Sequence, residues 1–155
     1  MSQQVAETRI RGQVISLSQE DKRIVDLKYG KQSGVPYGDL RVRCQNGKYE
    51  GEGEAKHWVI TDESYFNVRV FKADAEKAAT ELKLFDEVFI EGKVTTDHWD
   101  KKDSTGAVMI NEKTQKPLQN YKQVILANLF VKTADSNFKP AAEVAATEEA
   151  LTHQG

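Results

Sequence analysis

The chain has 155 residues, of which 39% are hydrophobic and 30% charged, a composition that predicts one globular domain with a real core. No apolar run is long enough to span a bilayer, and the N-terminal residues lack the basic-then-apolar pattern of a secretory signal. Cys44 is the only cysteine, so an internal disulfide is excluded and a reducing compartment, the cytoplasm, is expected.

Charge is distributed unevenly along the chain. The whole sequence carries a net charge of −2, but residues 134–155 hold four acids against one lysine, which leaves a net of +1 for the remainder. A nearly neutral body can still present a basic face if its acids lie elsewhere. Composition therefore neither supports nor excludes a polyanionic partner.

Three strands are predicted in the first part of the chain, at residues 9–18, 23–30 and 39–45. In the third, the apolar Leu40, Val42 and Cys44 alternate with Arg41 and Arg43. This alternation predicts a strand with one buried face and one basic, outward face. The Gly/Glu/Lys-rich residues 46–56 predict a hairpin tip or loop.

The second part predicts a strand at 65–71, a helix at 74–83 with Asp74 as its N-cap, and strands at 87–99 and 121–132. Residues 100–120 are predicted to form a long polar connection, with a β-hairpin as one possible structure. Short strands with one helix between the third and fourth major strands predict an all-β fold, a five-stranded Greek-key OB-fold barrel with long hairpin loops. Its boundaries are expected at 1–133, followed by a mildly acidic, disordered tail at 134–155.

Aromatic and basic residues share the polar faces of two predicted strands. Tyr65, Arg69 and Phe71 lie on one strand, opposite an apolar set that suffices for a core. On the later strand, the polar face carries Phe89, Lys93 and Trp99, again opposite an apolar set. A single outward aromatic usually packs on a neighbour. Two such strands instead favour a platform on which bases stack while cations meet phosphates.

Further cations could extend this platform. They are Arg41 and Arg43 on the first basic strand, Lys48 and Lys56 in the first long loop, and Lys101, Lys102, Lys113 and Lys116 in the second. Basic loops are also common as ordinary solvated surface.

Nothing in the sequence indicates catalysis or a bound cofactor. The three histidines and single cysteine have no zinc-ligand spacing, and no phosphate-binding loop, nucleophile elbow or zinc-protease motif is present. The chain is therefore expected not to be an enzyme and to need no cofactor.

The runs "YFNVRVF" (65–71) and "FDEVFIEGKVTTDHW" (85–99), with a helix between them, resemble the bacterial-type single-stranded DNA-binding protein family. The resemblance covers 65–132 well and 9–50 weakly. It implies an OB fold, with Tyr65 and Trp99 at base-stacking Trp positions and Phe71 at a stacking Phe position. Tyr49 corresponds to a further aromatic in the first long loop.

The resemblance also implies a homodimer or homotetramer that acts in DNA replication, recombination or repair at the nucleoid. The C-terminal "EEALTHQG" lacks the family's usual Pro-Phe end, through which replication and recombination proteins are recruited. A short, divergent chain of this kind suggests a phage or mobile element.

Two other interpretations remain open. The same aromatics could be buried at a protein interface, because an OB fold does not fix function. RNA could replace DNA, because stacking ignores the sugar.

Overall fold

The structure, a computed structural model, describes residues 4–136. The tail is predicted at 134–155; Ala134 is the last residue of β6, and residues 137–155 lie outside the described residues, so the predicted disorder there is untested. The elements are β1 (Glu7–Ile15), β2 (Val25–Tyr29), β3 (Pro36–Glu50), a 3-10 turn (Gly53–Ala55), β4 (His57–Phe71), α1 (Ala73–Glu81), β5 (Glu87–Asp100) and β6 (Gln119–Ala134).

The strands form a closed ring. Their order is β1-β5-β6-β4-β3-β2, and β1 also pairs with β3, which closes β1, β5, β6, β4 and β3 into a barrel. β1 pairs with Arg41–Arg43 and β2 with Pro36–Leu40, so the two lie end to end along one edge of β3. They act as one strand interrupted by a loop. The predicted five-stranded OB barrel is therefore confirmed, with its first strand in two pieces.

The core fills this barrel. Val14, Val42, Val70, Val88 and Ile90 are all completely buried. The predicted alternation in β3, β4 and β5 is thus confirmed: the inward residues are apolar and the outward ones polar, basic or aromatic. Ala75 and Ala78 of α1 are also buried, so the helix packs against the barrel through small side chains.

The start of α1 differs from the prediction. Asp74 is not the N-cap, because the helix begins at Ala73 and the preceding Lys72 occupies the cap with a φ of 57° and no side-chain cap hydrogen bond. Asp74 lies instead in the first turn. In that position, its carboxylate interacts favourably with the positive end of the helix dipole.

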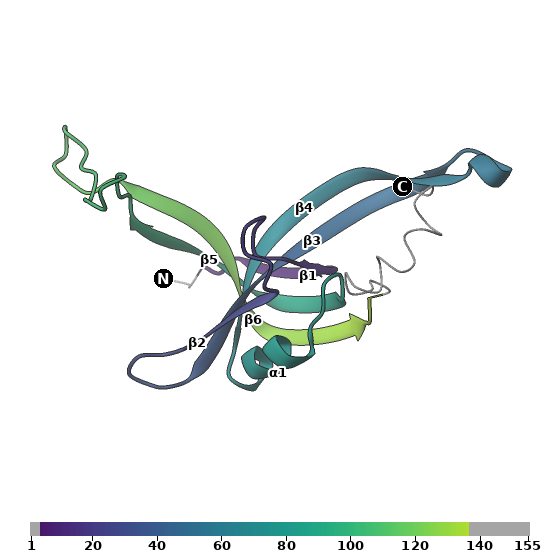
Figure 1. Cartoon of the computed structure of the whole chain (residues 1–155), viewed down its shortest axis with the longest axis horizontal. Helices are drawn as coiled ribbons and strands as arrows, with labels where there is room; N and C mark the ends of the chain where they lie inside the picture. The colour runs from purple at the N-terminus through teal and green to yellow at the C-terminus, as the bar shows by residue number, and fades with distance from the viewer. Residues whose placement is uncertain (1–3, 137–155) are drawn as a thin grey trace.

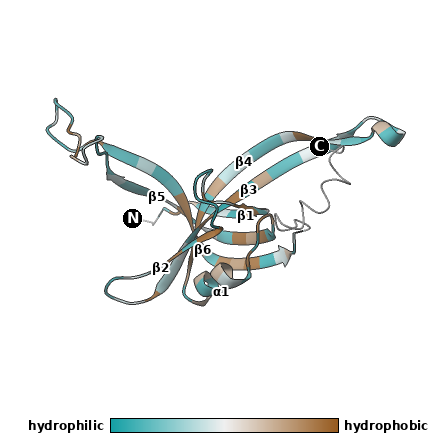
Figure 2. Cartoon of the chain, in the orientation of Figure 1, coloured by the Kyte–Doolittle hydropathy of each residue, from teal (hydrophilic) through white to brown (hydrophobic). Residues whose placement is uncertain are grey.

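Two hairpin arms leave the barrel in diverging directions (Figure 1). One is the outer part of β3 and β4, and the other is the outer part of β5 and β6. Figure 2 shows the arms as mainly hydrophilic, while the apolar segments gather where the strands cross in the barrel. The arm strands extend well beyond the predicted ones: β3 reaches Glu50 and β4 begins at His57.

The connection at 101–118 is ordered by short turns, with isolated bridges between Lys102 and Val108 and between Ile110 and Pro117. The Asp103 carboxylate accepts a hydrogen bond from the Thr105 N–H at 2.8 Å, and the Asn111 side chain accepts one from Lys113 N–H at 2.9 Å. These Asx-type turns explain how a polar segment keeps a hairpin-like course.

Candidate nucleic-acid interface

The outward residues of β3 and β4 form one continuous surface, which we call the front face. Residues opposite each other in an antiparallel pair point to the same side of a sheet. The register places four such pairs on this surface: Tyr37 with Phe71, Asp39 with Arg69, Arg41 with Asn67, and Arg43 with Tyr65. Five of the predicted site residues, Arg41, Arg43, Tyr65, Arg69 and Phe71, are therefore brought together.

Tyr65 lies at the centre of the front face. Its ring is about half exposed, and the Arg41 guanidinium covers it at 4.8 Å from the centroid. The Tyr65 hydroxyl donates a hydrogen bond to Glu63, which also accepts one from Gln45 at 2.6 Å. The bond between them raises the pKa of Tyr65 and lowers the pKa of Glu63. These contacts fix the position of the half-exposed Tyr65 ring.

Arg69 is not a free cation. Its Nε donates to Asp39 at 2.7 Å and its Nη2 donates to Asp97 of β5 at 2.9 Å. The Asp39 hydrogen bond and the two nearby carboxylates raise the pKa of this guanidinium despite the opposing effect of its partial burial. Arg69 thus ties β3, β4 and β5 together instead of offering an unpaired charge to a phosphate.

Arg43 is also partly committed. Its Nη2 donates to Gln13 at 2.8 Å, and its guanidinium lies 5.0 Å from the Phe85 ring centroid. The remaining donors of the face are Arg41 and the Asn67 amide, which donates to the Gln123 carbonyl at 3.3 Å.

The β3–β4 arm carries an aromatic pair that continues the alternation of the front face. Tyr49 lies opposite Trp58, with their ring centroids 5.0 Å apart in a T-shaped arrangement, and Lys56 is 4.9 Å from the Tyr49 centroid. Gly47 makes room for this pair, since a Cβ there would lie 2.5 Å from Trp58 Cε2. Tyr49 and Trp58 therefore place two rings together on one side of the β3–β4 arm.

Sequence reasoning missed Trp58, which is half exposed. The run "HWVITDES" gives no strand prediction, because an arm exposed on both sides shows no apolar alternation. The signal that could have found it is a tryptophan two residues after Lys56, at the end of the Gly/Glu/Lys-rich loop.

Trp99 lies on the other arm. It is opposite Asn120, 47% exposed, and shares its strand side with Asp97, which contacts Arg69. Lys102 lines a shallow depression beside Trp99, and the preceding Lys101 donates its backbone N–H to the Leu118 carbonyl. The two arms thus each carry an exposed tryptophan, with the front face between them.

The other predicted residues are placed less favourably. Lys93 of β5 lies opposite Leu126 of β6, and Leu126 lies opposite Arg69 of β4. Lys93 is therefore two strands away from Arg69, in line with the Asp39–Arg69 pair across the sheet. Phe89 lies between β1 and β6, opposite Arg11 and Val131, and the Arg11 guanidinium is 5.7 Å from its ring centroid. Phe89 is therefore grouped with β1 and β6 and not with β3 and β4.

Lys48 alternates with Tyr49 and so points to the opposite side of the arm, where its Nζ is 3.4 Å from Glu50.

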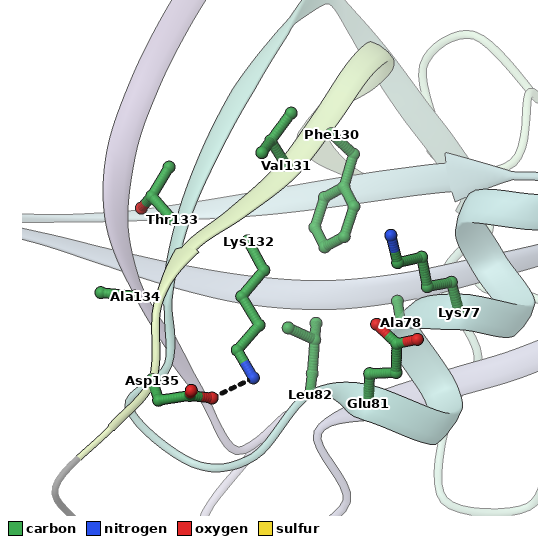
Figure 3. Close-up of a pocket in the computed structure, with 10 residues that line it drawn as sticks. All are labelled: Lys77, Ala78, Glu81, Leu82, Phe130, Val131, Lys132, Thr133, Ala134 and Asp135. Atoms are coloured by element: carbon green, nitrogen blue, oxygen red, sulfur yellow. Dashed lines mark ion pairs between the residues drawn. The ribbon is translucent and has the colours of Figure 1, made fainter.

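A second hollow lies between α1 and the end of β6 (Figure 3). Its apolar floor includes Ala78, Leu82 and Phe130, and Lys132 bridges to Asp135 at its edge. All of its lining residues come from α1 and from residues 130–135, so it is separate from the front face.

Neither a metal site nor a membrane span is evident in the described part of the chain. Among residues 4–136, no three His, Cys, Asp or Glu side chains are grouped as metal ligands. No helix in that range is long and apolar enough to cross a bilayer.

A five-stranded OB barrel with exposed aromatics and arginines on one face defines the class of oligonucleotide-binding barrel proteins. The model of the single-strand binding protein family matches residues 23–121, more than half of the chain. The chain belongs to that family.

Among solved structures, the chain is similar to the small single-stranded DNA-binding protein from Streptomyces coelicolor. The TM-score is 0.56 at 12% identity, over 84% of this chain and 96% of that one. At this identity the likeness shows the fold alone. No curated protein matches the sequence.

Proposed function

We propose that this protein binds and protects single-stranded DNA, largely without sequence preference, by base stacking and phosphate contact. One observation supports it most: in a chain of the single-strand binding family, exposed aromatic rings lie on the front face and on both arms, namely Tyr65, Phe71, Tyr49, Trp58 and Trp99. Every base has a π-face, so stacking on such rings tolerates any sequence.

The wider role follows from the same proposal. The protein acts in DNA replication, recombination or repair, as a homo-oligomer without catalytic activity, in the cytoplasm at the nucleoid. Recruitment of replication or recombination proteins would involve the C-terminal tail.

The positions of the two tryptophans give a direct test. Trp58 and Trp99 lie on different arms, so Trp58→Phe and Trp99→Phe each leave a single reporter. We expect unstructured oligo-dT to quench both reporters, with weaker quenching as salt rises and little response to duplex of equal length. Matched RNA oligomers test for RNA preference. No response from either variant, with no band shift, would favour the protein-interaction interpretation.

Substituting Trp99 by Ala should weaken oligo-dT binding by about 1–3 kcal/mol while leaving the unfolding midpoint nearly unchanged, because the ring is exposed. Tyr29→Ala is a matched control, since Tyr29 is exposed but alternates with Lys28 and points away from Tyr37. Equal losses in both variants would argue against a localised platform.

A further inference from the structure

A hollow of about 320 Å³ opens beside the front face, between the loop after β1, strands β2, β3 and β4, and strand β6. Its lining includes the almost completely buried Val68 and Val124. Arg41 and Asn67 line it from the front face, and Lys122 from β6. Lys122 lies directly opposite Asp97, so β6 carries it at the base of the second arm. The hollow therefore lies where a single strand of nucleic acid that contacts both arms would pass.

Three carboxylates line this hollow, and each is already neutralised. Asp39 accepts from Arg69 at 2.7 Å. Asp26 is paired with Arg23 at 3.1 Å and Lys28 at 3.2 Å, and Asp21 with Arg23 at 2.7 Å. Carboxylates held in such pairs repel an incoming phosphate less than free ones do, and they do not bind the other cations of the hollow.

Two cations of the hollow are uncommitted. Within residues 4–136, neither Arg41 nor Lys122 has a carboxylate within ion-pair distance. Arg41 lies over the Tyr65 ring, which leaves the edge N–H donors of its guanidinium available. A planar edge of this kind donates to two phosphate oxygens at once, and a lysine supplies a third, point-like contact.

We propose that Arg41 and Lys122 together bind one phosphate of the single strand at this hollow, between the bases held on the two arms. This inference rests on the proposed function and adds to it a phosphate subsite that includes Lys122. The ion-paired Arg69, Arg23 and Lys28 shape the hollow without contacting the phosphate.

The salt dependence of oligo-dT binding by the full chain tests this subsite. Each phosphate contact on a single strand contributes about 0.7 to the slope of log K against log salt. Because the two cations share one phosphate, we expect the double variant to lower that slope by about 0.7, and Lys122→Gln and Arg41→Gln each to lower it by part of that amount. Lys122→Arg should keep the wild-type slope, because it keeps the charge.

Two further variants serve as controls. Lys28→Gln removes a committed cation of the same hollow, and Lys77→Gln removes a lysine of α1 outside it. Both should leave the slope unchanged. Comparing dT, dC and dA oligomers separates phosphate from base contact, because a phosphate subsite gives the same decrease with all three.

The outcomes distinguish the two proposals. If the wild type does not bind oligo-dT, the proposed function fails. If the wild type binds with a clear salt slope that Lys122→Gln and Arg41→Gln leave unchanged, the function stands and the subsite is wrong. A decrease confined to one base, or equal in Lys28→Gln, also overturns the subsite.

Discussion

Some arginines of the front face are held by contacts within the fold, and others remain available to contact a phosphate. Arg69 is bound by Asp39 and Asp97, and Arg43 is held by Gln13 and Phe85. Arg41, by contrast, lies over the Tyr65 ring and forms no ion pair with any residue of the described range 4–136. The count of basic residues in the sequence therefore overstates the charge that a phosphate would meet, because ion pairs within the fold use part of it.

Among the single side chains, Trp58 gives the sharpest prediction. Trp58→Ala should weaken oligo-dT binding by about 1–3 kcal/mol, and Trp58→Phe by less, because phenylalanine keeps a π-face for stacking. Fluorescence anisotropy of a labelled oligo-dT measures both affinities.

Val59→Ala is the control, since Val59 lies on the same arm opposite Lys48 and alternates with Trp58. If Val59→Ala costs as much as Trp58→Ala, the arm matters through its backbone and not through a stacked ring.

Strand β5 depends on a close approach between its Gly92 and the backbone of β6. A Cβ at Gly92 would lie 2.2 Å from the Leu126 carbonyl oxygen, next to the register shift between Glu91 and Gly92. Backbone cannot yield as a flexible side chain can. The barrel therefore requires glycine at this point of the β5–β6 pairing.

Gly92→Ala should destabilise the fold by about 1–3 kcal/mol through this overpacking. Urea unfolding followed by circular dichroism provides the measurement. Lys93→Ala is the adjacent control on the exposed side of the strand and should change the unfolding midpoint little. A Gly92→Ala variant as stable as wild type would show that β5 and β6 can move apart without cost.

At the scale of the whole molecule, Asp86 joins the end of β6 to the turn before β5. This buried carboxylate accepts from the Lys83 N–H at 2.8 Å and the Ser136 N–H at 2.7 Å, and pairs with Lys132 at 3.2 Å. Burial alone would raise its pKa, but the two backbone donors and Lys132 outweigh burial and lower it. The ionised form is therefore the one that holds these segments together.

This pKa shift predicts a pH dependence of stability. A carboxyl whose pKa is lower folded than unfolded stabilises the fold above its unfolded pKa, and the contribution is lost as pH falls through the folded value. We expect the free energy of unfolding to decrease below about pH 4, the ordinary range of an aspartate. Asp86→Asn should cost about 1.5–3 kcal/mol at neutral pH.

Chemical denaturation across pH 2–7 measures the effect, and the difference between wild type and Asp86→Asn should shrink in acid. Asp135→Asn removes the exposed partner of the same Lys132 and should cost less. A difference that stays constant with pH would mean that the Asp86 charge does not matter.

The sequence alone was sufficient to predict the barrel. Alternation in 39–45, 65–71 and 87–99 predicted strands with one buried face, because side chains on a strand alternate between its two sides, and the helix between the later strands pointed to the OB fold. It also predicted that Tyr65, Phe71 and Trp99 lie on the outward faces of their strands, where the structure exposes them. Only the tertiary structure decided which cations are free, because Asp39, Arg69 and Asp97 are distant in sequence and meet across three strands. The structure also decided the length of the arms, since strands exposed on both sides are fixed by cross-strand hydrogen bonds that leave no hydrophobic pattern in the sequence.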